Sequence, residues 1–285
     1  MSSPNRTADA RLAVLVLAAE DIYSAQGPRA TEPAIDPRIT AEWTLRGYIV
    51  GTDAILRAFG KLAFGEQRVY YGLVLESRLT PGSFAAVVRG TAGAVEWGED
   101  FEGVPTIVGR FPGRVEAGFS AIYDSFAYRA PGASETPLIS TLSAIVGGGT
   151  LIVAGHSLGS ALATYLAYDA ALALPGRVSL RVFASPRTGN AELVGAVAAA
   201  VPDHRHWRNP NDIVPRVPIA LGYEHLPNTV DIGPSTGTVE IKSDWGSSHH
   251  LLCYIALLDD NLLGSATAAQ DVPYLSSIIK HPVAA

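Results

Sequence analysis

The segment TLIVAGHSLGSALATY, residues 150–165, decides the fold of this chain. Four apolar residues, 151–154, predict a short buried strand, and the small and apolar residues from Ser160 onward predict a helix. Between them, GHSLG (residues 155–159) has the G-x-S-x-G pattern of a sharp strand-to-helix turn that exposes a serine hydroxyl. Side chains two positions before and after the serine would collide in such a turn, which accounts for the glycines. We therefore predict that Ser157 is a nucleophile and that the amino end of the helix stabilises a developing oxyanion.

The composition is that of an apolar, weakly charged globular protein. Of 285 residues, 48% are hydrophobic and 17% are charged, which allows a sizeable core in one large α/β domain or two smaller ones. The formal net charge is −6 and lysine and arginine do not cluster, so nothing indicates a nucleic-acid partner. Cys253 is the single cysteine, which excludes an intramolecular disulfide, and the scattered histidines form no metal-binding pattern.

The N-terminal region contains an apolar run, residues 12–19, which is preceded by Arg6 and Arg11 and followed at once by two acidic residues. The run is too short to span a bilayer, and no clear cleavage site follows it. We predict an amphipathic helix over residues 8–25 that packs on the core. This interpretation favours a cytoplasmic location and leaves secretion open.

The rest of the chain alternates between strand and helix patterns. Strands are predicted at 69–77, 83–89, 151–154, 178–184 and 204–209, helices at 50–64, 118–128, 136–146, 160–167 and 251–260, and a hairpin at 230–241. Such alternation with buried strands predicts a mostly parallel central sheet flanked by helices on both faces. With the serine turn, it predicts one α/β-hydrolase domain over residues 1–285, in which residues 1–65 form an N-terminal helical extension.

A serine nucleophile needs a base and an orienting carboxylate, which in α/β-hydrolases follow the serine as acid and then histidine. Asp212, just beyond the strand predicted at 204–209, is the best candidate for the acid. Four other aspartates fit less well. Asp169 lies on the helix that follows Ser157, and the other three do not directly follow a predicted strand: Asp203, Asp231 and Asp244.

The base is less determined, because four histidines follow Asp212. His281 lies in the tail and His225 is close behind the acid, whereas the His249-His250 pair begins the final helix after a flexible segment. We expect one member of the pair to be the base and the other to be a surface or capping residue.

Two backbone N–H groups are needed for an oxyanion hole. One should come from Leu158, directly after the nucleophile. The other should come from the loop that follows an early strand, where Thr91 could contribute both its N–H and its hydroxyl.

These motifs, in this order, resemble the class 3 lipase family of α/β-hydrolases, over about residues 84–258. The matching segments are VRGT (88–91), EWxxD (96–100), GF (118–119), GHSLGSALA (155–163), FASPRTGN (183–190), NDIVPRVP (211–218), GYEH (222–225) and HxLxxY (249–254). Ser160 departs from the glycine that is more frequent in the family. The tyrosine is also placed as in bacterial and plant-like members rather than as in fungal ones.

The resemblance implies Ser157, Asp212 and a final histidine as the catalytic triad, with Thr91 and Leu158 in the oxyanion hole. The HxLxxY pattern favours His249 over His250 as that histidine. The implied activity is hydrolysis of acylglycerols or related lipid esters through an acyl-enzyme, with no cofactor and no metal.

The implied partners are a lipid or small ester substrate and a possible lipid interface, with no obligate protein partner. A feruloyl-type esterase, a phospholipase A1 and an inactive hydrolase-fold binding module are the alternatives. Residues 92–103, with four acidic and few large apolar side chains, are either a short lid or an ordinary loop.

Overall fold

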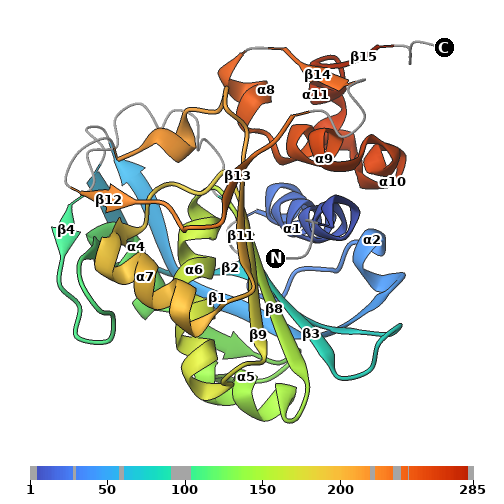
Figure 1. Ribbon diagram of the computed structural model, residues 1–285. Coiled ribbons are helices and arrows are strands. Elements are labelled where there is room, and N and C mark those ends of the chain that lie inside the picture. The colour runs from blue at the N-terminus through green and yellow to red at the C-terminus, as the bar shows by residue number, and fades with distance from the viewer. Residues whose placement is uncertain are drawn as a thin grey trace.

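The computed structural model describes residues 5–27, 30–57, 61–90, 104–218, 222–233, 239–242 and 244–281, with the backbone alone at 53–57, 61–66 and 245. Within these residues, a nine-stranded sheet forms the centre of the molecule in the order β13-β11-β9-β8-β3-β2-β1-β6-β7 (Figure 1). Its strands are β1 (Trp43–Arg57), β2 (Lys61–Ser77), β3 (Ser83–Val88), β6 (Ala127–Arg129), β7 (Glu135–Pro137), β8 (Thr150–His156), β9 (Val178–Phe183), β11 (His204–Arg208) and β13 (Thr229–Asp231).

The sheet is parallel from β3 through β8, β9 and β11 to β13, and antiparallel from β3 through β2, β1 and β6 to β7. The predicted parallel sheet is therefore confirmed for the core strands, whereas the sheet as a whole is mixed. The serine turn lies at the carboxyl end of β8, which lies between β3 and β9 in the parallel part of the sheet.

Helices cover both faces of the sheet, as predicted (Figure 1). One face carries α4 (Ala117–Asp124), α5 (Leu138–Val146), α6 (Leu158–Ala173) and α7 (Ala191–Ala200), and the other carries α1 (Arg6–Gln26) and α9 (Leu251–Asp259). Strand β3 shows why the central strands have continuous apolar sequences. Phe84, Ala86 and Val88 join the core on the first face of the sheet, and Ala85 and Val87 join the core on the second.

Shorter elements connect these layers. They are α2 (Pro37–Thr40), α8 (Trp245–His249), α10 (Leu263–Ala266), α11 (Val272–Leu275), the 3₁₀ turns η1 (Val214–Arg216), η2 (Asp260–Leu262) and η3 (Ala269–Asp271), the four-stranded sheet of β4 (Pro105–Thr106), β5 (Val115–Glu116), β10 (Gly189–Asn190) and β12 (Tyr223–Glu224), and the pair β14 (Val239–Ile241) and β15 (Ile278–Lys280).

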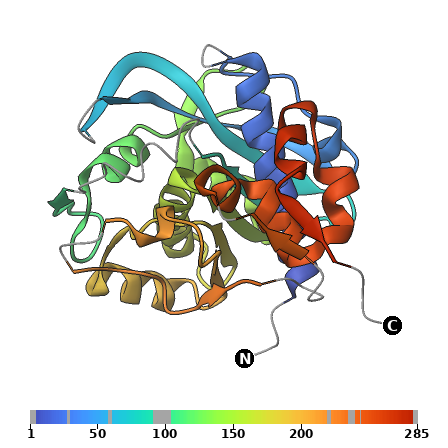
Figure 2. The same ribbon diagram turned by 90° about the horizontal axis from the view of Figure 1, so that it is seen from above.

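Helix α1 confirms the helix predicted near the N-terminus. Asn5 caps it by accepting a hydrogen bond of 3.1 Å from the Ala8 N–H. Its apolar side chains join one core with those of α9 and of the sheet face that both helices cover. Figure 2 shows α1 beside the C-terminal helices. None of the helices in the described part of the chain is both long enough and apolar enough to cross a membrane.

The helix predicted at residues 50–64 is wrong. This stretch belongs to the antiparallel pair β1–β2, whose register continues through Ala54↔Phe64 to Arg57↔Lys61. The backbone at Gly51 passes so close to aromatic side chains that a Cβ there would lie 2.8 Å from Phe126. A glycine needed for such an approach suits a strand and weakens a helix. The segment 1–65 is therefore only partly helical, because β1 is part of the central sheet.

Three boundaries also differ from the predictions. The helix predicted at 118–128 ends at Asp124, and Tyr128 belongs to β6. The helix predicted at 136–146 begins at Leu138, after β7. The predicted hairpin at 230–241 does not form: β13 pairs with β11, and β14 pairs with β15. Strands β6, β13 and β14 pair with the more distant segments β1, β11 and β15, which local pattern does not reveal, whereas β7 pairs with the nearby β6.

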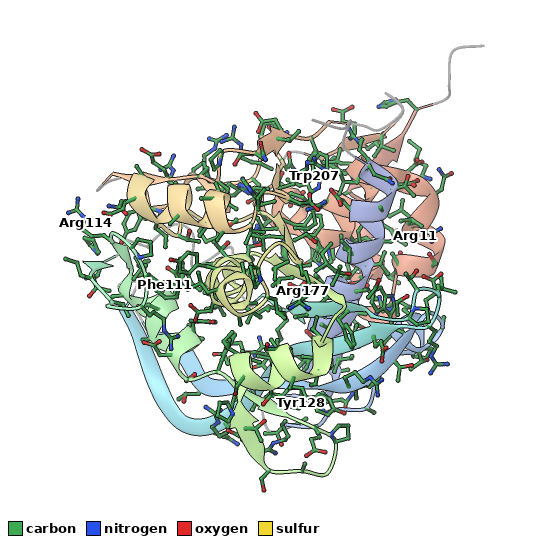
Figure 3. All side chains as sticks on the ribbon, turned by 60° about the horizontal axis from the view of Figure 1, so that its bottom comes forward. Arg11, Phe111, Arg114, Tyr128, Arg177 and Trp207 are labelled. Atoms are coloured by element: carbon green, nitrogen blue, oxygen red, sulfur yellow. The ribbon has the colours of Figure 1, made fainter. Side chains whose placement is uncertain are left out.

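The buried carboxylate of Asp9 holds α1 to β9 and β11 of the parallel part of the sheet. It accepts hydrogen bonds from Arg181 Nε at 2.8 Å and from Trp207 Nε1 at 2.9 Å, and it pairs with Arg205 at 3.3 Å. Trp207 lies beside α1 in Figure 3. These donors come from β9 and β11, so one side chain connects the helix to two strands.

We predict that Asp9→Ala lowers the free energy of unfolding by about 3 kcal/mol, because a guanidinium and an indole N–H lose their buried acceptor. Urea denaturation measures the change. Asp203→Ala is the matched control, since Asp203 also pairs with Arg181, at 2.9 Å, but its side chain is 64% exposed. The control should lose less than about 1 kcal/mol. Equal losses in the two variants would contradict the anchoring role of Asp9.

Candidate active site

The turn between β8 and α6 holds Ser157 in an unusual backbone conformation, with φ 55° and ψ −130°. Its N–H donates a hydrogen bond of 3.0 Å to the Phe183 carbonyl of β9. A Cβ on Gly155 would lie 2.3 Å from the Gly159 carbonyl oxygen, and a Cβ on Gly159 would lie 2.3 Å from the Arg89 carbonyl oxygen. Both glycines are therefore required by close backbone approach, the second one because α6 begins against the end of β3.

Ser160 has a defined structural role at the position where the resemblance led us to expect glycine. Its hydroxyl lies 2.8 Å from both the Gly155 carbonyl and the Phe183 carbonyl. The side chain thus connects the first turn of α6 to β8 and to β9, and it stabilises the strained turn from the helix side.

The structure brings Ser157, His249 and Asp212 together. His249 Nε2 lies 2.9 Å from Ser157 Oγ, and His249 Nδ1 lies 2.8 Å from Asp212 Oδ2. The three residues are 0%, 4% and 1% exposed. A carboxylate can only accept, so Nδ1 carries the hydrogen and Nε2 is free to accept the serine proton. Asp212 follows β11 and His249 ends α8, in the predicted chain order.

Tyr254 holds the Asp212 carboxylate, a contact that the sequence did not predict. Its hydroxyl donates to Asp212 Oδ2 at 2.7 Å, while the Val214 N–H donates to Asp212 Oδ1 at 2.9 Å. The Tyr254 oxygen in turn accepts from the Asn209 N–H at 3.0 Å. Burial, together with the adjacent carboxylate, raises the pKa of Tyr254 well above its ordinary value, so it remains a donor. The HxLxxY spacing was the available signal.

A second histidine, His156, precedes Ser157 and connects it to α1. Its Nδ1 lies 2.9 Å from Glu20 Oε1 and its Nε2 lies 2.9 Å from the His249 carbonyl oxygen. Both partners can only accept, so both ring nitrogens carry hydrogens. Burial lowers the pKa of His156, but attraction to Glu20 and the two hydrogen bonds outweigh burial and raise it. The ring centroids of His156 and His249 are 4.7 Å apart.

Glu20 also holds the turn that precedes Thr91. Its Oε1 accepts the Gly90 N–H at 2.8 Å, and buried Arg89 donates to the Gly90 carbonyl at 2.8 Å. The Arg89 guanidinium lies 3.4 Å from the Tyr23 ring centroid. Thr91 itself and the lid candidate at 92–103 lie outside the described residues. Leu158 is the first residue of α6, where a helix leaves its N–H groups without intrahelical acceptors.

The other histidine candidates for the base lie elsewhere. His250 caps α9 by accepting from the Leu252 N–H, and its ring stacks on Tyr274 with a centroid distance of 3.6 Å. His225 packs against His206 with centroids 5.1 Å apart, and burial lowers the pKa of His225 to about 4. His281 pairs with Glu240 at the surface.

The other aspartates considered for the acid bond to residues outside the Ser157–His249–Asp212 chain. Asp169 accepts from Tyr123, Asp203 pairs with Arg181, Asp231 pairs with Arg208, and Asp244 caps α8. No group of three or more metal-binding side chains that could hold an ion occurs among the residues described.

We predict a pH-dependent loss of stability in Glu20→Gln. The pKa of Glu20 is lowered, because His156 outweighs burial, and the pKa of His156 is raised. Glu20 therefore contributes stability above its ordinary pKa of 4.5, and His156 contributes it fully below its ordinary pKa of 6.5. The variant should lose about 1–3 kcal/mol between about pH 5 and 6.5, and the difference should shrink as pH rises through the raised pKa of His156.

Urea unfolding across pH measures this difference. Glu240→Gln is the matched control, because it removes the carboxylate of the surface pair with His281, whose side chains are 66% and 51% exposed. The control should change stability little at any pH. A loss in Glu20→Gln that is the same at pH 6 and well above the pKa of His156 would contradict the ion pair.

Residues 85–222 match the model of the Lipase (class 3) family. The chain is 34% identical over 119 residues to the secreted mono- and diacylglycerol lipase MDL3 of Malassezia globosa, which covers 36% of this chain and 39% of the relative. It is 30% identical over 206 residues to phospholipase A1-II 7 of Oryza sativa subsp. indica, which covers 59% of this chain and 49% of the relative. The chain thus spans less than half of each relative.

Solved structures share the fold. A Rhizomucor miehei lipase propeptide complex has a TM-score of 0.55 at 19% identity, covering 81% of this chain and 70% of that one. A mutant form of MDLA from Penicillium cyclopium has a TM-score of 0.53 at 22% identity, covering 84% and 82%. A triacylglycerol lipase described as having a serine protease triad has a TM-score of 0.55 at 21% identity, covering 80% and 78%. The chain is thus similar to the class 3 lipase family over residues 85–222, and it shares the α/β-hydrolase fold of the solved lipases.

Proposed function

We propose that this chain is a serine hydrolase of carboxylic esters, acting on mono- and diacylglycerols or related lipid esters through an acyl-enzyme. The observation that carries the proposal is the continuous buried hydrogen-bond chain from Ser157 Oγ through His249 to Asp212. The strained turn that presents Ser157, and the order in which the three residues follow one another, support the same chemistry. No cofactor takes part in this mechanism.

In this mechanism, His249 Nε2 takes the proton as Ser157 Oγ bonds to the ester carbonyl carbon. Asp212 stabilises the imidazolium that forms, and the N–H of Leu158, with Thr91, binds the negative carbonyl oxygen. The alcohol leaves with the proton from His249. Water then attacks the acyl-enzyme with the help of the same base, which releases the acid and restores Ser157.

The environment of Asp212 supports this assignment. Two donors, the Tyr254 hydroxyl and the Val214 N–H, already point at the two oxygens of its carboxylate. The carboxylate is therefore oriented toward His249 Nδ1 before any substrate binds, so no reorganisation is needed when the imidazolium forms.

The substrate class rests on the relatives. The names of the fungal relatives refer to mono- and diacylglycerols, which favours acylglycerols for this chain. Phospholipase A1 activity is the second candidate, because the match to the rice phospholipase A1 covers more of this chain than the matches to those fungal lipases. Initial rates on monoolein, triolein, phosphatidylcholine and a feruloyl ester separate these candidates. A rate increase above the micelle threshold would support contact with a lipid interface.

We predict that Ser157→Ala lowers the hydrolysis of p-nitrophenyl butyrate by about 10⁴-fold or more, because the nucleophile is lost. It should also abolish covalent labelling by a fluorophosphonate probe. Ser120→Ala is the matched control, since Ser120 is also buried and its hydroxyl donates to the Ala117 carbonyl within α4, at 3.0 Å. The proposed activity is wrong if Ser157→Ala retains the rate of the unmodified protein.

We predict that Tyr254→Phe lowers kcat by about 10-fold or more and leaves KM nearly unchanged, because Asp212 loses one of its donors while the ring volume is kept. Tyr165→Phe is the control, because it removes another buried tyrosine hydroxyl, one that donates to the Thr188 carbonyl at 2.7 Å. The control should keep kcat. A wild-type kcat in folded Tyr254→Phe would show that this contact does not position the acid.

A further inference from the structure

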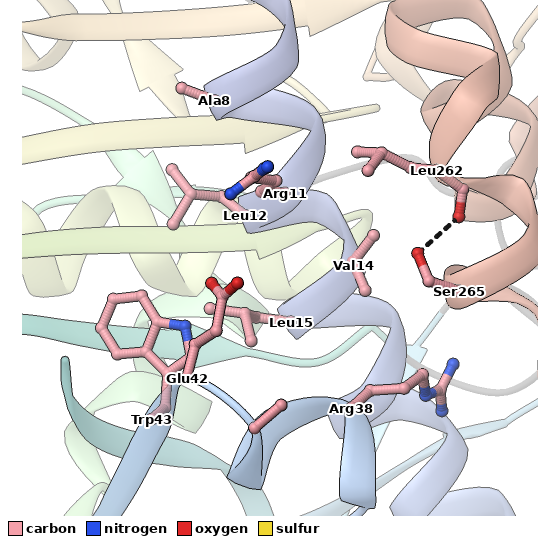
Figure 4. A pocket seen from close by; sticks show the side chains of 11 residues that line it. Ala8, Arg11, Leu12, Val14, Leu15, Arg38, Glu42, Trp43, Leu262 and Ser265 are labelled. Carbon is pink, nitrogen blue, oxygen red and sulfur yellow. Dashed lines mark hydrogen bonds between the residues drawn. The ribbon is translucent and has the colours of Figure 1, made fainter. Parts of the chain in front are cut away.

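A hollow of about 590 Å³ lies between α1, the junction of α2 with β1, and the η2–α10 segment (Figure 4). Its volume is within the range of about 300–1,000 Å³ that is typical of sites for small molecules. Every lining residue lies between 8 and 43 or between 262 and 265, outside the family match at 85–222. The hollow is therefore built by parts of the chain to which the family model assigns nothing.

The wall of the hollow is mostly apolar. Leu12 and Leu15 of α1, Trp43 at the start of β1 and Leu262 from η2 are its largest apolar side chains. Figure 4 shows Trp43 and Leu15 on one side of the hollow and Leu262 on another. Such a lining favours a ligand with an apolar body.

Some of the polar side chains in the wall already have partners within the protein. Arg38 is occupied, because it pairs with Asp21 at 2.6 Å and with Asp36 at 2.7 Å. The Ser265 hydroxyl donates to the Leu262 carbonyl at 3.0 Å. These side chains have little capacity left for a ligand.

Arg11 and Glu42 are the charged groups that remain. Neither forms an ion pair within the described part of the chain. Arg11 contributes to the lowered pKa of Asp259, after the Thr7 hydrogen bond to that carboxylate, but it does not reach ion-pair distance. The hollow thus offers one cation, which can only donate, and one anion, which can only accept.

We propose that this hollow is a second lipid site, which binds a single-chain amphiphile with an uncharged, hydroxyl-bearing head, the chemistry of a monoacylglycerol. The chain lies against Leu12, Leu15 and Trp43, and the head lies between Arg11 and Glu42. A hydroxyl donates to the carboxylate and accepts from the guanidinium, whereas a head with a single charge meets one group of its own sign. The site is separate from the triad: Leu12 lies about 12 Å along α1 from Glu20, which contacts His156.

The test uses the full chain and an ether, 1-O-decylglycerol with bromines midway along the chain, which no esterase can cleave. Bromine quenches nearby indoles, so the fluorescence of Trp43 should fall to a saturating level as the probe is added. Trp43→Phe should remove the saturable quenching, since it removes the reporter in the wall. Quenching that persists unchanged in Trp43→Phe would place the probe elsewhere and overturn the proposal.

Two variants test the location and the head group. Ala8→Phe fills the hollow from an exposed position of α1 and should weaken binding at least 10-fold, whereas Ala199→Phe, on an exposed position of α7, should not. Glu42→Gln should weaken binding several-fold while the protein stays folded. The proposal fails if Ala8→Phe binds as tightly as the unmodified chain, or if brominated decanoate binds as tightly as the glycerol ether. These measurements do not involve hydrolysis at Ser157, so their outcome is independent of the proposed activity.

Discussion

The positive φ of Ser157 is the constraint on which the rest of the site depends. An L-residue in this conformation costs about 1–3 kcal/mol, and it persists only where the surroundings hold it. Here the Ser157 N–H is bonded to Phe183, the Ser160 hydroxyl is bonded across the turn, and Gly159 is in close backbone contact with the end of β3. Because Gly159 leaves no room for a Cβ, the turn cannot move without moving the Arg89–Gly90 segment. The serine and the segment that leads to Thr91 are therefore positioned by the same contact.

Helix α1 lies outside the family match and yet completes this arrangement. Near its start, Asp9 holds the helix to β9 and β11, and near its end Glu20 bonds both to His156 and to Gly90. Buried charges are costly unless they are paired and hydrogen-bonded. The two carboxylates of α1 find their partners only in this position, so they favour the packing of α1 against this part of the sheet. We therefore propose that the N-terminal segment belongs to the same domain as the serine turn.

The sequence predicts what is local or ordered along the chain. The G-x-S-x-G pattern lies between a strand and a helix, and each of them forms. Asp212 and the His249-His250 pair are predicted because an acid and then a base follow the serine in α/β-hydrolases, and Asp212 and His249 lie in one hydrogen-bond chain with Ser157. The residues that were missed act over long sequence distances: Glu20 is separated from His156 by 136 residues, and Tyr254 is separated from Asp212 by 42. The error at 50–64 has the same origin, because its apolar spacing fits a helix and only the partner strand shows that it is a β-strand.

The histidines show how hydrogen-bond partners rather than residue type decide which one can act as a base. His156 faces two acceptors and has no free lone pair. His206 Nε2 already accepts the Ser185 N–H, and its Nδ1 faces the oxygen of Thr229, whose hydrogen is directed to the Leu226 carbonyl. Burial lowers the pKa of His206 well below its ordinary value. Among the residues described, His249 alone has one nitrogen held by a carboxylate and the other facing a serine hydroxyl. It can therefore accept a proton from that hydroxyl without giving up an existing hydrogen bond, which is the requirement that a general base must meet.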